Sequence, residues 1–183
     1  MDLILIITFG VLIGCLIGIS WFAGSDAPYV PTKTTRIRKL LKSIPLKGKT
    51  FYELGSGDGR VVRVAAELGA QAIGIEQSLL RILYSRYKSF RQKLANAKFW
   101  YGNIFDQNYT DADVVFIFLL PKGVEKLEDK LKKELKKDSL IITQTFHFKK
   151  WKPYKKIVIM DKKTPNILLG PDKIEGDFWL YKV

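Results

Sequence analysis

A glycine-rich loop directly after a short apolar run restricts the fold of this chain more than any other feature. Residues 51–60 read Phe-Tyr-Glu-Leu-Gly-Ser-Gly-Asp-Gly-Arg, and the pattern that follows predicts a helix over residues 60–68. Alternate glycines let the backbone approach a nucleotide-like ligand closely, because they carry no Cβ. A strand, a glycine loop and a helix in this order indicate the first unit of a parallel sheet wound with helices.

Short apolar runs and helical patterns continue to alternate along the rest of the chain. A helix is expected over residues 37–44, and the spacing of Leu80, Leu83, Tyr84, Tyr87 and Leu94 predicts a long amphipathic helix. Besides the first strand at residues 51–54, strands are expected at residues 72–75, 98–101, 113–119, 139–144, 157–160 and 177–181. The sequence therefore predicts a Rossmann-like α/β fold with a seven-stranded sheet.

One further helix is expected between the fourth and fifth strands. Val124, Leu127, Leu131 and Leu135 recur at helical spacing and form its inner stripe. Glu128 with Lys132, and Asp129 with Lys133, are expected to form exposed ion pairs four residues apart.

The N-terminal segment Leu3–Phe22 contains no charged residue. Twenty helical residues reach about 30 Å, the thickness of the hydrocarbon core of a bilayer. We therefore expect residues 1–23 to be a single transmembrane anchor. The alternative is a cleaved signal peptide, which is disfavoured because no basic residue precedes the apolar run. Gly10, Gly14 and Gly18 share one helix face and would permit a homodimer through this helix.

The chain is strongly basic, with a formal net charge of +13. Basic residues cluster just after the apolar segment and none precedes it, so the positive-inside rule places the folded domain on the cytoplasmic side of a membrane. An anionic lipid surface is the expected partner of this charge. Nucleic acid is the second choice, since no basic-aromatic RNA-binding motif is present.

Two carboxylates near the glycine loop indicate what kind of ligand it holds. A dinucleotide loop would have its third glycine at position 60, which is Arg60, and Glu53 ahead of the loop would repel a pyrophosphate. Glu53 suits a cationic ligand instead, and Glu76, about 20 residues after the loop, suits the hydroxyls of a ribose. Asn103 and Ile104 could contact an adenine, although Asn103 could equally be an ordinary turn residue. The expected binding residues are Glu53, Gly55, Ser56, Gly57, Asp58, Gly59, Glu76, Gln77, Asn103 and Ile104.

These residues resemble the motifs of the seven-β-strand, or class I, methyltransferases. Within them the chain is similar to the membrane-anchored lysine methyltransferases typified by the ATP synthase c-subunit and adenine nucleotide translocase enzymes. The resemblance lies in Pro28-Tyr-Val-Pro31, Leu54-Gly-Ser-Gly-Asp-Gly-Arg60, Leu127-Glu-Asp-Lys-Leu131, Trp151-Lys-Pro153 and Trp179-Leu-Tyr181. The chain differs from the family at Glu76-Gln-Ser78, where Glu-Leu-Asn is usual, and at Asn103, where an aspartate is usual.

The resemblance implies S-adenosyl-L-methionine as the cofactor, no metal, and a protein substrate with a lysine acceptor, embedded in a membrane or docked on one. It divides the chain into an anchor (1–23), a connector with a helix (24–49) and a methyltransferase domain (50–183). A dry pocket would favour the neutral form of the acceptor lysine, and we expect Tyr29, Phe118, Leu119 and Pro121 to form it.

Two other functions are left open by the residues. One is methylation of a lipid, a quinone or another small acceptor in the bilayer, and the other is a non-catalytic, cofactor-binding membrane protein. His147, the only histidine, has no evident acidic partner in the sequence, so we expect a structural or surface role for it.

Overall fold

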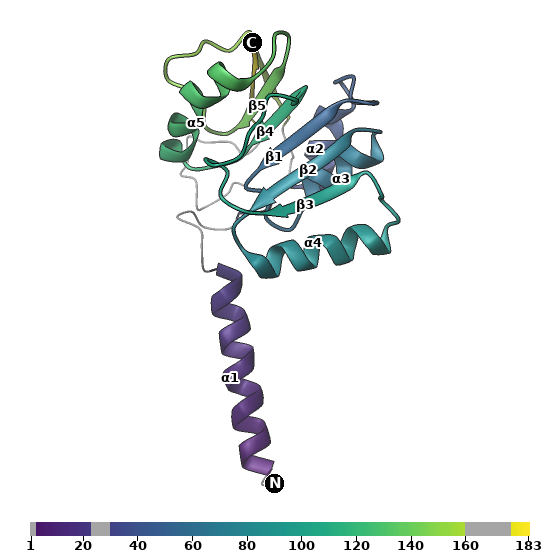
Figure 1. The fold of residues 1–183 in the computed structure, drawn as a ribbon, viewed down its shortest axis with the longest axis vertical. Helices are drawn as coiled ribbons and strands as arrows, with labels where there is room; N and C mark the ends of the chain where they lie inside the picture. Colours follow the sequence, from purple (N-terminus) through teal and green to yellow (C-terminus); the bar gives the residue numbers. More distant parts are fainter. Residues whose placement is uncertain (1–2, 23–29, 160–176) are drawn as a thin grey trace.

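The computed structural model describes residues 3–22, 30–159 and 177–183. Its centre is a seven-stranded sheet in the order β3-β2-β1-β4-β5-β7-β6 (Figure 1). The first five strands are parallel, and β7 runs antiparallel to both of its neighbours. The strands are β1 (Thr50–Leu54), β2 (Gln71–Glu76), β3 (Ala97–Tyr101), β4 (Val114–Ile117), β5 (Leu140–Gln144), β6 (Lys155–Val158) and β7 (Asp177–Lys182). The predicted Rossmann-like α/β sheet is confirmed.

Helices cover both faces of the sheet. One core joins α2 (Thr34–Leu41), α3 (Arg60–Glu67) and α4 (Leu79–Arg91) to the side chains on one face, among them Phe51, Phe99 and Phe116. The other core packs α5 (Pro121–Glu134) against the opposite face, through residues such as Leu127. This alternation follows from the period of two in each strand, which sends successive side chains to opposite faces.

The fourth strand is shorter than the sequence predicted. Hydrogen-bonded pairing ends at Ile117, and Phe118, Leu119 and Leu120 lead into α5, whose first residue is Pro121. Proline is well suited to the first turn of a helix, because its missing N–H would have no helical partner there. The apolar run 118–120 is therefore a loop at the end of the strand. The predicted strand at 157–160 corresponds to β6, and its last residue lies outside the described residues.

The predicted ion pairs on α5 are wrong. Glu128 is buried, and its carboxylate accepts hydrogen bonds from the backbone N–H groups of Lys149 (3.2 Å) and Lys150 (2.9 Å). Asp129 pairs with the Nζ atom of Lys150 at 3.1 Å. The segment that follows β5 folds back onto α5 and brings these lysines to the helix, a long-range contact that helical spacing does not reveal.

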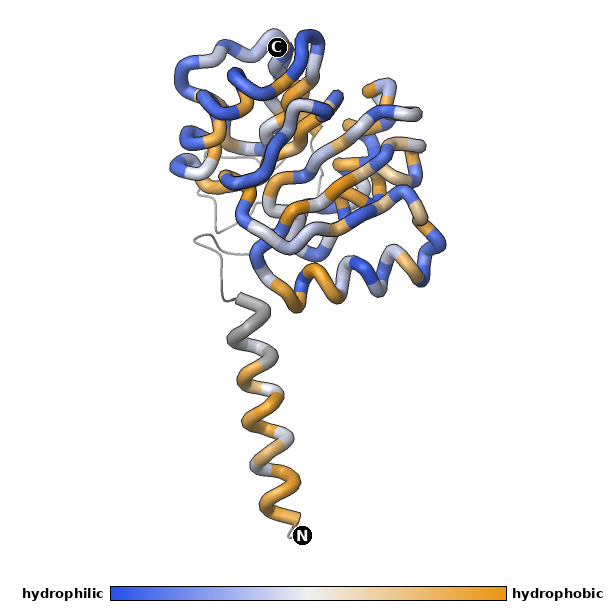
Figure 2. The backbone as a smooth tube through the Cα atoms, in the orientation of Figure 1, coloured by the Kyte–Doolittle hydropathy of each residue, from blue (hydrophilic) through white to orange (hydrophobic). Residues whose placement is uncertain are grey.

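The N-terminal helix α1 (Leu3–Phe22) forms where the sequence predicts it and extends away from the sheet domain (Figures 1 and 2). Its apolar side chains are exposed at Leu3, Ile4, Leu5, Ile6, Ile7, Phe9, Val11, Leu12, Ile13 and Leu16. A search of the described part of the chain identifies no helix with the length and hydropathy needed to cross a bilayer. The transmembrane prediction therefore gains no support from the structure.

Candidate functional site

A cavity of about 970 Å³ opens at the carboxyl ends of β1, β2 and β4. This is where ligands bind in parallel α/β sheets, because the loops that leave adjacent strands diverge there. The cavity brings together most of the residues expected from the sequence: Glu53, Gly55, Ser56, Gly57, Asp58, Glu76, Gln77, Asn103, Ile104, Phe118, Leu119 and Pro121. Their individual roles stay predictions, and Tyr29 lies outside the described residues.

The glycine loop wraps one side of the cavity. Gly55, Gly57 and Gly59 all have positive φ angles (78°, 54° and 72°). Residues with a Cβ atom rarely adopt this backbone conformation. Gly59 does not line the cavity and has a packing role instead. A Cβ at this position would lie 2.4 Å from the ring of Phe99 in β3, so the glycine allows the loop to sit close to the sheet.

Glu53 is a buried carboxylate that lines the cavity, with 6% of its surface exposed. Burial raises the pKa of Glu53 well above its ordinary value, and the nearby negative charge of Asp58 raises it further. A hydrogen bond from the backbone N–H of Val62 (3.2 Å) and the charge of Arg63 oppose this shift. A positively charged ligand would supply the counter-charge that favours the carboxylate form.

Glu76, at the end of β2, connects the glycine loop to the start of α4. Its carboxylate accepts hydrogen bonds from the backbone N–H groups of Gly57 and Ser78, both at 2.9 Å. Arg81 lies 3.6 Å from the same carboxylate. Each carboxylate oxygen can accept more than one hydrogen bond, so Glu76 keeps capacity for a pair of hydroxyl groups.

Arg60 fastens the segment before α2 to the glycine loop. Its guanidinium binds both carboxylate oxygens of Asp58 (Nε–Oδ1 2.9 Å, Nη2–Oδ2 2.7 Å) and donates to the backbone carbonyl of Thr32 (3.1 Å). Burial alone would raise the pKa of Asp58, but the hydrogen bonds and charge of Arg60 hold it below its ordinary value. Val30 and Pro31 consequently form part of the cavity wall.

The turn after β3 contributes Asn103, Ile104 and Phe105 to the cavity. The Oδ1 atom of Asn103 accepts a hydrogen bond from the backbone N–H of Phe105 at 3.0 Å, the geometry of an asparagine-stabilised turn. The turn role of Asn103 is thus present in the structure, and its contact with an adenine stays a prediction. The hydroxyl of Tyr109 donates to the carbonyl of Ile104 (2.6 Å) and holds the turn in place.

The residues that follow β4 add apolar and basic side chains to the cavity wall. Phe118, Leu119 and Pro121 are the apolar ones, and the exposed Lys122 and Lys126 of α5 are the basic ones. Leu119 lies close to the glycine loop, since a Cβ on Gly55 would be 3.0 Å from it. The Nζ atom of Lys126 lies 5.6 Å from the centre of the Phe105 ring.

Several lining residues were not predicted from the sequence. Phe105 immediately follows the predicted Asn103-Ile104 pair, and Arg60 ends the predicted loop, so both could have been found by extending the motifs. Leu120 lies inside the predicted run 118–121, and Val61, Lys122 and Gly123 directly follow predicted motifs. The remaining lining residues, Val30, Pro31, Thr32, Arg81 and Lys126, are brought to the cavity by the fold.

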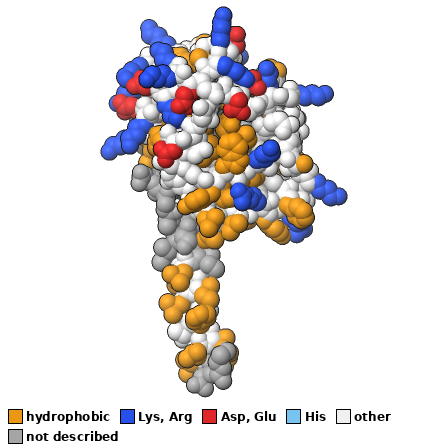
Figure 3. All heavy atoms as spheres, viewed as in Figure 1, with side chains coloured by type: hydrophobic (Ala, Val, Ile, Leu, Met, Phe, Trp, Pro, Cys, Tyr) orange, Lys and Arg blue, Asp and Glu red, His pale blue; other side chains and the backbone are white. Residues whose placement is uncertain are grey.

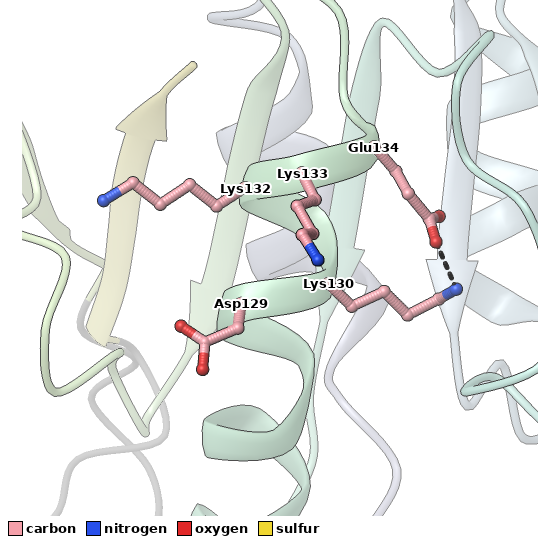
Figure 4. Close-up of a pocket in the computed structure, with 5 residues that line it drawn as sticks. All are labelled: Asp129, Lys130, Lys132, Lys133 and Glu134. Atoms are coloured by element: carbon pink, nitrogen blue, oxygen red, sulfur yellow. Dashed lines mark hydrogen bonds and ion pairs between the residues drawn. The ribbon is translucent and has the colours of Figure 1, made fainter.

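A second, more open depression lies on α5, and Figure 4 shows its five lining residues. The Nζ atom of Lys130 pairs with Glu134 one turn later, and that of Lys132 lies 5.7 Å from the ring of Trp151. Among the residues drawn, only Lys130 and Glu134 are paired with each other, and the five side chains do not converge on a common point (Figure 4).

His147 takes no part in the cavity. Its ring packs on Trp179, with centroids 4.9 Å apart, and its Nδ1 atom lies 2.8 Å from the carbonyl of Phe148. Within residues 3–22, 30–159 and 177–183, no three potential metal-ligating side chains come together.

Comparisons with known proteins identify relatives that are similar in sequence. The human lysine N-methyltransferase of the ATP synthase c-subunit is 34% identical over 69% of this chain and 54% of its own length. A protein-lysine N-methyltransferase of Saccharolobus islandicus is 33% identical over 73% of this chain and 86% of its own. The chain spans about half the length of the first of these relatives.

Solved structures agree with the fold. An RNA methyltransferase from Salinibacter ruber, determined with S-adenosyl-L-homocysteine, matches with a TM-score of 0.70 and 27% identity, over 84% of this chain and 93% of that one. The model of the ANTKMT methyltransferase domain matches residues 53–155, which are more than half of the sequence and contain the end of β1, the glycine loop and β2 to β5. This chain therefore belongs to the ANTKMT methyltransferase domain family.

Proposed function

We propose that this chain is an S-adenosyl-L-methionine-dependent methyltransferase that modifies lysine side chains of a protein. The observation that carries the proposal is a cavity lined both by buried carboxylates beside a glycine loop and by the apolar residues that follow β4. Family membership and the names of the human and Saccharolobus islandicus relatives support protein lysine as the acceptor.

The residues present fit this cofactor. The Oγ atom of Ser56 is buried in the loop without a hydrogen-bond partner among the described residues, and the positive φ angles of the loop glycines bring backbone close to the cavity. Glu53 would face the positive charge of the methionine part, Glu76 the ribose hydroxyls, and Ile104 with Phe105 the adenine. The cofactor supplies a methyl group already activated by its sulfonium.

The chain must then position and deprotonate the acceptor. A lysine amine has a reference pKa of about 10.4, so its neutral form costs about 4.6 kcal/mol at pH 7. An apolar wall disfavours the charged ammonium and reduces this cost. Phe118, Leu119 and Pro121 supply such a wall at the end of β4. Holding the amine in line with the methyl group would provide most of the acceleration.

Membrane attachment through α1, with the folded domain on the cytoplasmic side, also belongs to the proposal. It is supported by the uncharged sequence Leu3–Phe22 and by the basic residues that follow it. Gly10, Gly14 and Gly18 have open space around them, so a second α1 could approach closely on their face.

The test uses the full chain with radiolabelled cofactor and membranes from cells that lack this protein. We expect label on a protein band and a mass shift of one, two or three methyl groups on a lysine of that band. Label confined to the lipid extract or to added RNA would contradict a lysine acceptor. A Glu76→Ala variant that labels as fast as the unchanged chain would contradict the proposed site. Absence of transfer despite cofactor binding would favour a non-catalytic binding protein.

A further inference from the structure

Helix α4 exposes its apolar residues and buries its polar ones. Arg81, Ser85 and Ser89 are buried with Ile82 on the side that faces the sheet. The exposed apolar side chains are Leu79 (55% exposed), Leu83 (51%), Tyr84 (36%), Tyr87 (54%) and Phe90 (80%). A surface helix of a water-soluble domain normally shows the opposite arrangement, with its apolar stripe toward the core. Something other than the domain itself must therefore account for this stripe.

The exposed apolar surface continues onto the neighbouring edge strand. Tyr101 (63% exposed) lies on β3, which forms one edge of the sheet, whereas Trp100 packs against Tyr52 on the face opposite to α4. Figure 3 shows hydrophobic side chains gathered on the lower side of the domain, next to α1, with basic side chains among them. We call the exposed residues of α4 named above, with Tyr101, the α4 surface. Contiguous apolar surface of this kind marks an interaction site.

The charge of this region indicates an anionic partner. The segment from Ser78 to Lys98 contains six basic residues and no acidic one. Lys88 lies with its Nζ atom 5.4 Å from the centre of the Tyr84 ring, and the guanidinium of Arg91 lies 5.8 Å from that of Tyr87. Aromatic and leucine side chains bordered by lysine and arginine are typical of helices that lie in the headgroup region of a membrane.

We infer that the α4 surface docks on an anionic phospholipid bilayer. Leu79, Leu83 and Phe90 can insert among acyl chains, whereas the phosphates of a nucleic acid offer them no apolar partner. Two copies of this surface facing each other would bring basic side chains of both copies together, among them Lys88 and Arg91, without an acid between them, so electrostatics disfavours self-association. Helix α1 contacts α4, so the apolar N-terminal helix and the α4 surface lie on the same side of the domain (Figure 1).

Docking through α4 would also orient the cavity. Helix α4 begins at Leu79, two residues after Gln77, which lines the cavity wall. A bilayer against α4 would therefore lie near one side of the cavity. This consequence for substrate access rests on the proposed function, but the docking itself does not and is measured without any methyl transfer.

The test places an environment-sensitive fluorophore on the full chain, incorporated into vesicles. A Phe90→Cys variant, with the exposed Cys15 replaced by serine, carries the probe on α4. The matched control is Tyr154→Cys with the same replacement. Tyr154 is 53% exposed and precedes β6, at the other edge of the sheet. A lysine lies next to its ring, just as an arginine lies next to the ring of Tyr87.

We expect a blue shift of the probe at position 90 with phosphatidylcholine vesicles that contain phosphatidylglycerol, a much smaller shift with phosphatidylcholine alone, and none at position 154. Replacing Lys88 and Arg91 by glutamine should lower the ratio of docked to undocked protein about 25-fold, at about 1 kcal/mol for each charge. Replacing Lys152 and Lys155 by glutamine should leave it unchanged.

Three results would overturn the inference. The first is an absent shift at position 90, or equal shifts at positions 90 and 154. The second is a shift that requires added RNA and does not occur with lipid. The third is a shift that rises with protein concentration in the absence of vesicles, which would identify a second copy as the occupant. Cofactor binding measured on the same samples distinguishes each of these results from failure of the proposed function.

Discussion

At the scale of single residues, the site combines a buried acid with glycines that no other residue can replace without strain. Glu53 is nearly inaccessible to solvent, and the first cause of its raised pKa is that burial. Gly59 combines a positive φ with a packed neighbour. The buried acid reduces the stability of the empty protein while shaping a place for a ligand, a common compromise at functional sites, whereas Gly59 lets the loop adopt its conformation without strain.

Replacing Glu53 by glutamine should weaken S-adenosyl-L-methionine binding about 30-fold or more, the usual consequence of removing one partner of a buried charge pair. A cationic ligand requires the carboxylate form, so the affinity of the unchanged protein should fall as the pH drops below the raised pKa of Glu53. Calorimetric titrations across a pH series should show this slope in the unchanged protein and lose it in the variant. The exposed Glu125→Gln variant serves as control, and an equal slope in Glu53→Gln would contradict the assignment.

The same variant should stabilise the ligand-free protein at neutral pH. The pKa of Glu53 is higher in the folded protein than in the unfolded chain. As the pH rises, Glu53 therefore ionises first in the unfolded chain, and the free energy of unfolding decreases. The decrease ends when the pH passes the pKa of Glu53 in the folded protein. A glutamine at position 53 does not ionise, so the variant does not undergo this decrease in the free energy of unfolding. Thermal unfolding should show a higher Tm, by roughly 2–4 °C for each kcal/mol regained in a domain of this size.

A Gly59→Ala substitution should reduce the free energy of unfolding by about 2–5 kcal/mol. About 1–2 kcal/mol comes from the left-handed backbone conformation and about 1–3 kcal/mol from the clash with Phe99. Gly48→Ala is the matched control, because Gly48 has a similar φ of 75° and no atom within 4 Å of an added Cβ. Urea unfolding that gave equal losses for both variants would exclude the packing role of Gly59.

At the scale of elements, long-range hydrogen bonds fix how loops lie against the sheet. The Arg60 guanidinium joins the glycine loop to Thr32, and the Glu128 carboxylate joins α5 to the segment after β5. Each contact crosses between elements that are distant in sequence, so neither follows from helical or strand periodicity.

An Arg60→Lys substitution should release the segment before α2 from the cavity. Lysine keeps the charge but lacks the planar fork that binds both oxygens of Asp58 and also reaches the carbonyl of Thr32. Amide hydrogen exchange at Thr32 and Lys33 should accelerate severalfold, consistent with about 1 kcal/mol for one lost hydrogen bond. Arg38→Lys, which alters an exposed pair with Glu67, should leave exchange there unchanged, and equal effects of both variants would contradict the role of Arg60.

A Glu128→Gln substitution should lower the free energy of unfolding by about 1.5–3 kcal/mol, because two backbone N–H groups lose a charged acceptor. Asp129→Asn is the control on the next residue, since its ion pair with Lys150 is exposed and should contribute no measurable stability. Guanidinium unfolding of both variants makes the comparison. A larger loss for Asp129→Asn would refute the importance of the buried carboxylate.

At the scale of the whole molecule, the folded domain begins before the first strand. Ile37, Leu40 and Leu41 of α2 are fully or nearly fully buried in the core that covers one sheet face. The α2 helix, expected within a connector, is thus packed into the same core as the sheet. The domain therefore presents an apolar interior continuous from α2 to β7, with the α4 surface left outside it.

A Leu41→Ala substitution should reduce the global free energy of unfolding by about 2–5 kcal/mol, the usual result of removing a fully buried leucine side chain. The half-exposed Leu83→Ala should change it by no more than about 0.5 kcal/mol. Circular dichroism during urea unfolding measures both. An early, separate transition for Leu41→Ala would show that α2 unfolds independently of the sheet.

Local patterns determined the identity and order of the elements and the chemistry of one side of the site. The seven strands and the loop around Gly55 and Gly57 are encoded by alternating apolar residues and glycines within short windows, so they can be read directly from the sequence. The prediction and the structure differ mainly where the position of a side chain depends on residues far away in the sequence. Glu128 reaches Lys149 and Lys150, and the outward face of Leu83 and Tyr87 depends on how α4 lies on the sheet.

Sequence alone thus determined a strand, a glycine turn and two acids at the spacing that a cationic, adenosine-bearing ligand requires. Only the tertiary structure decided that Val30, Pro31, Lys122 and Lys126 complete the same cavity, and that α4 leaves its apolar stripe uncovered. The physical reason is the distance in sequence over which each interaction acts. Backbone conformation and amphipathic period are set by residues within a few positions of one another, whereas cavity walls and exposed faces depend on the packing of segments far apart in the chain.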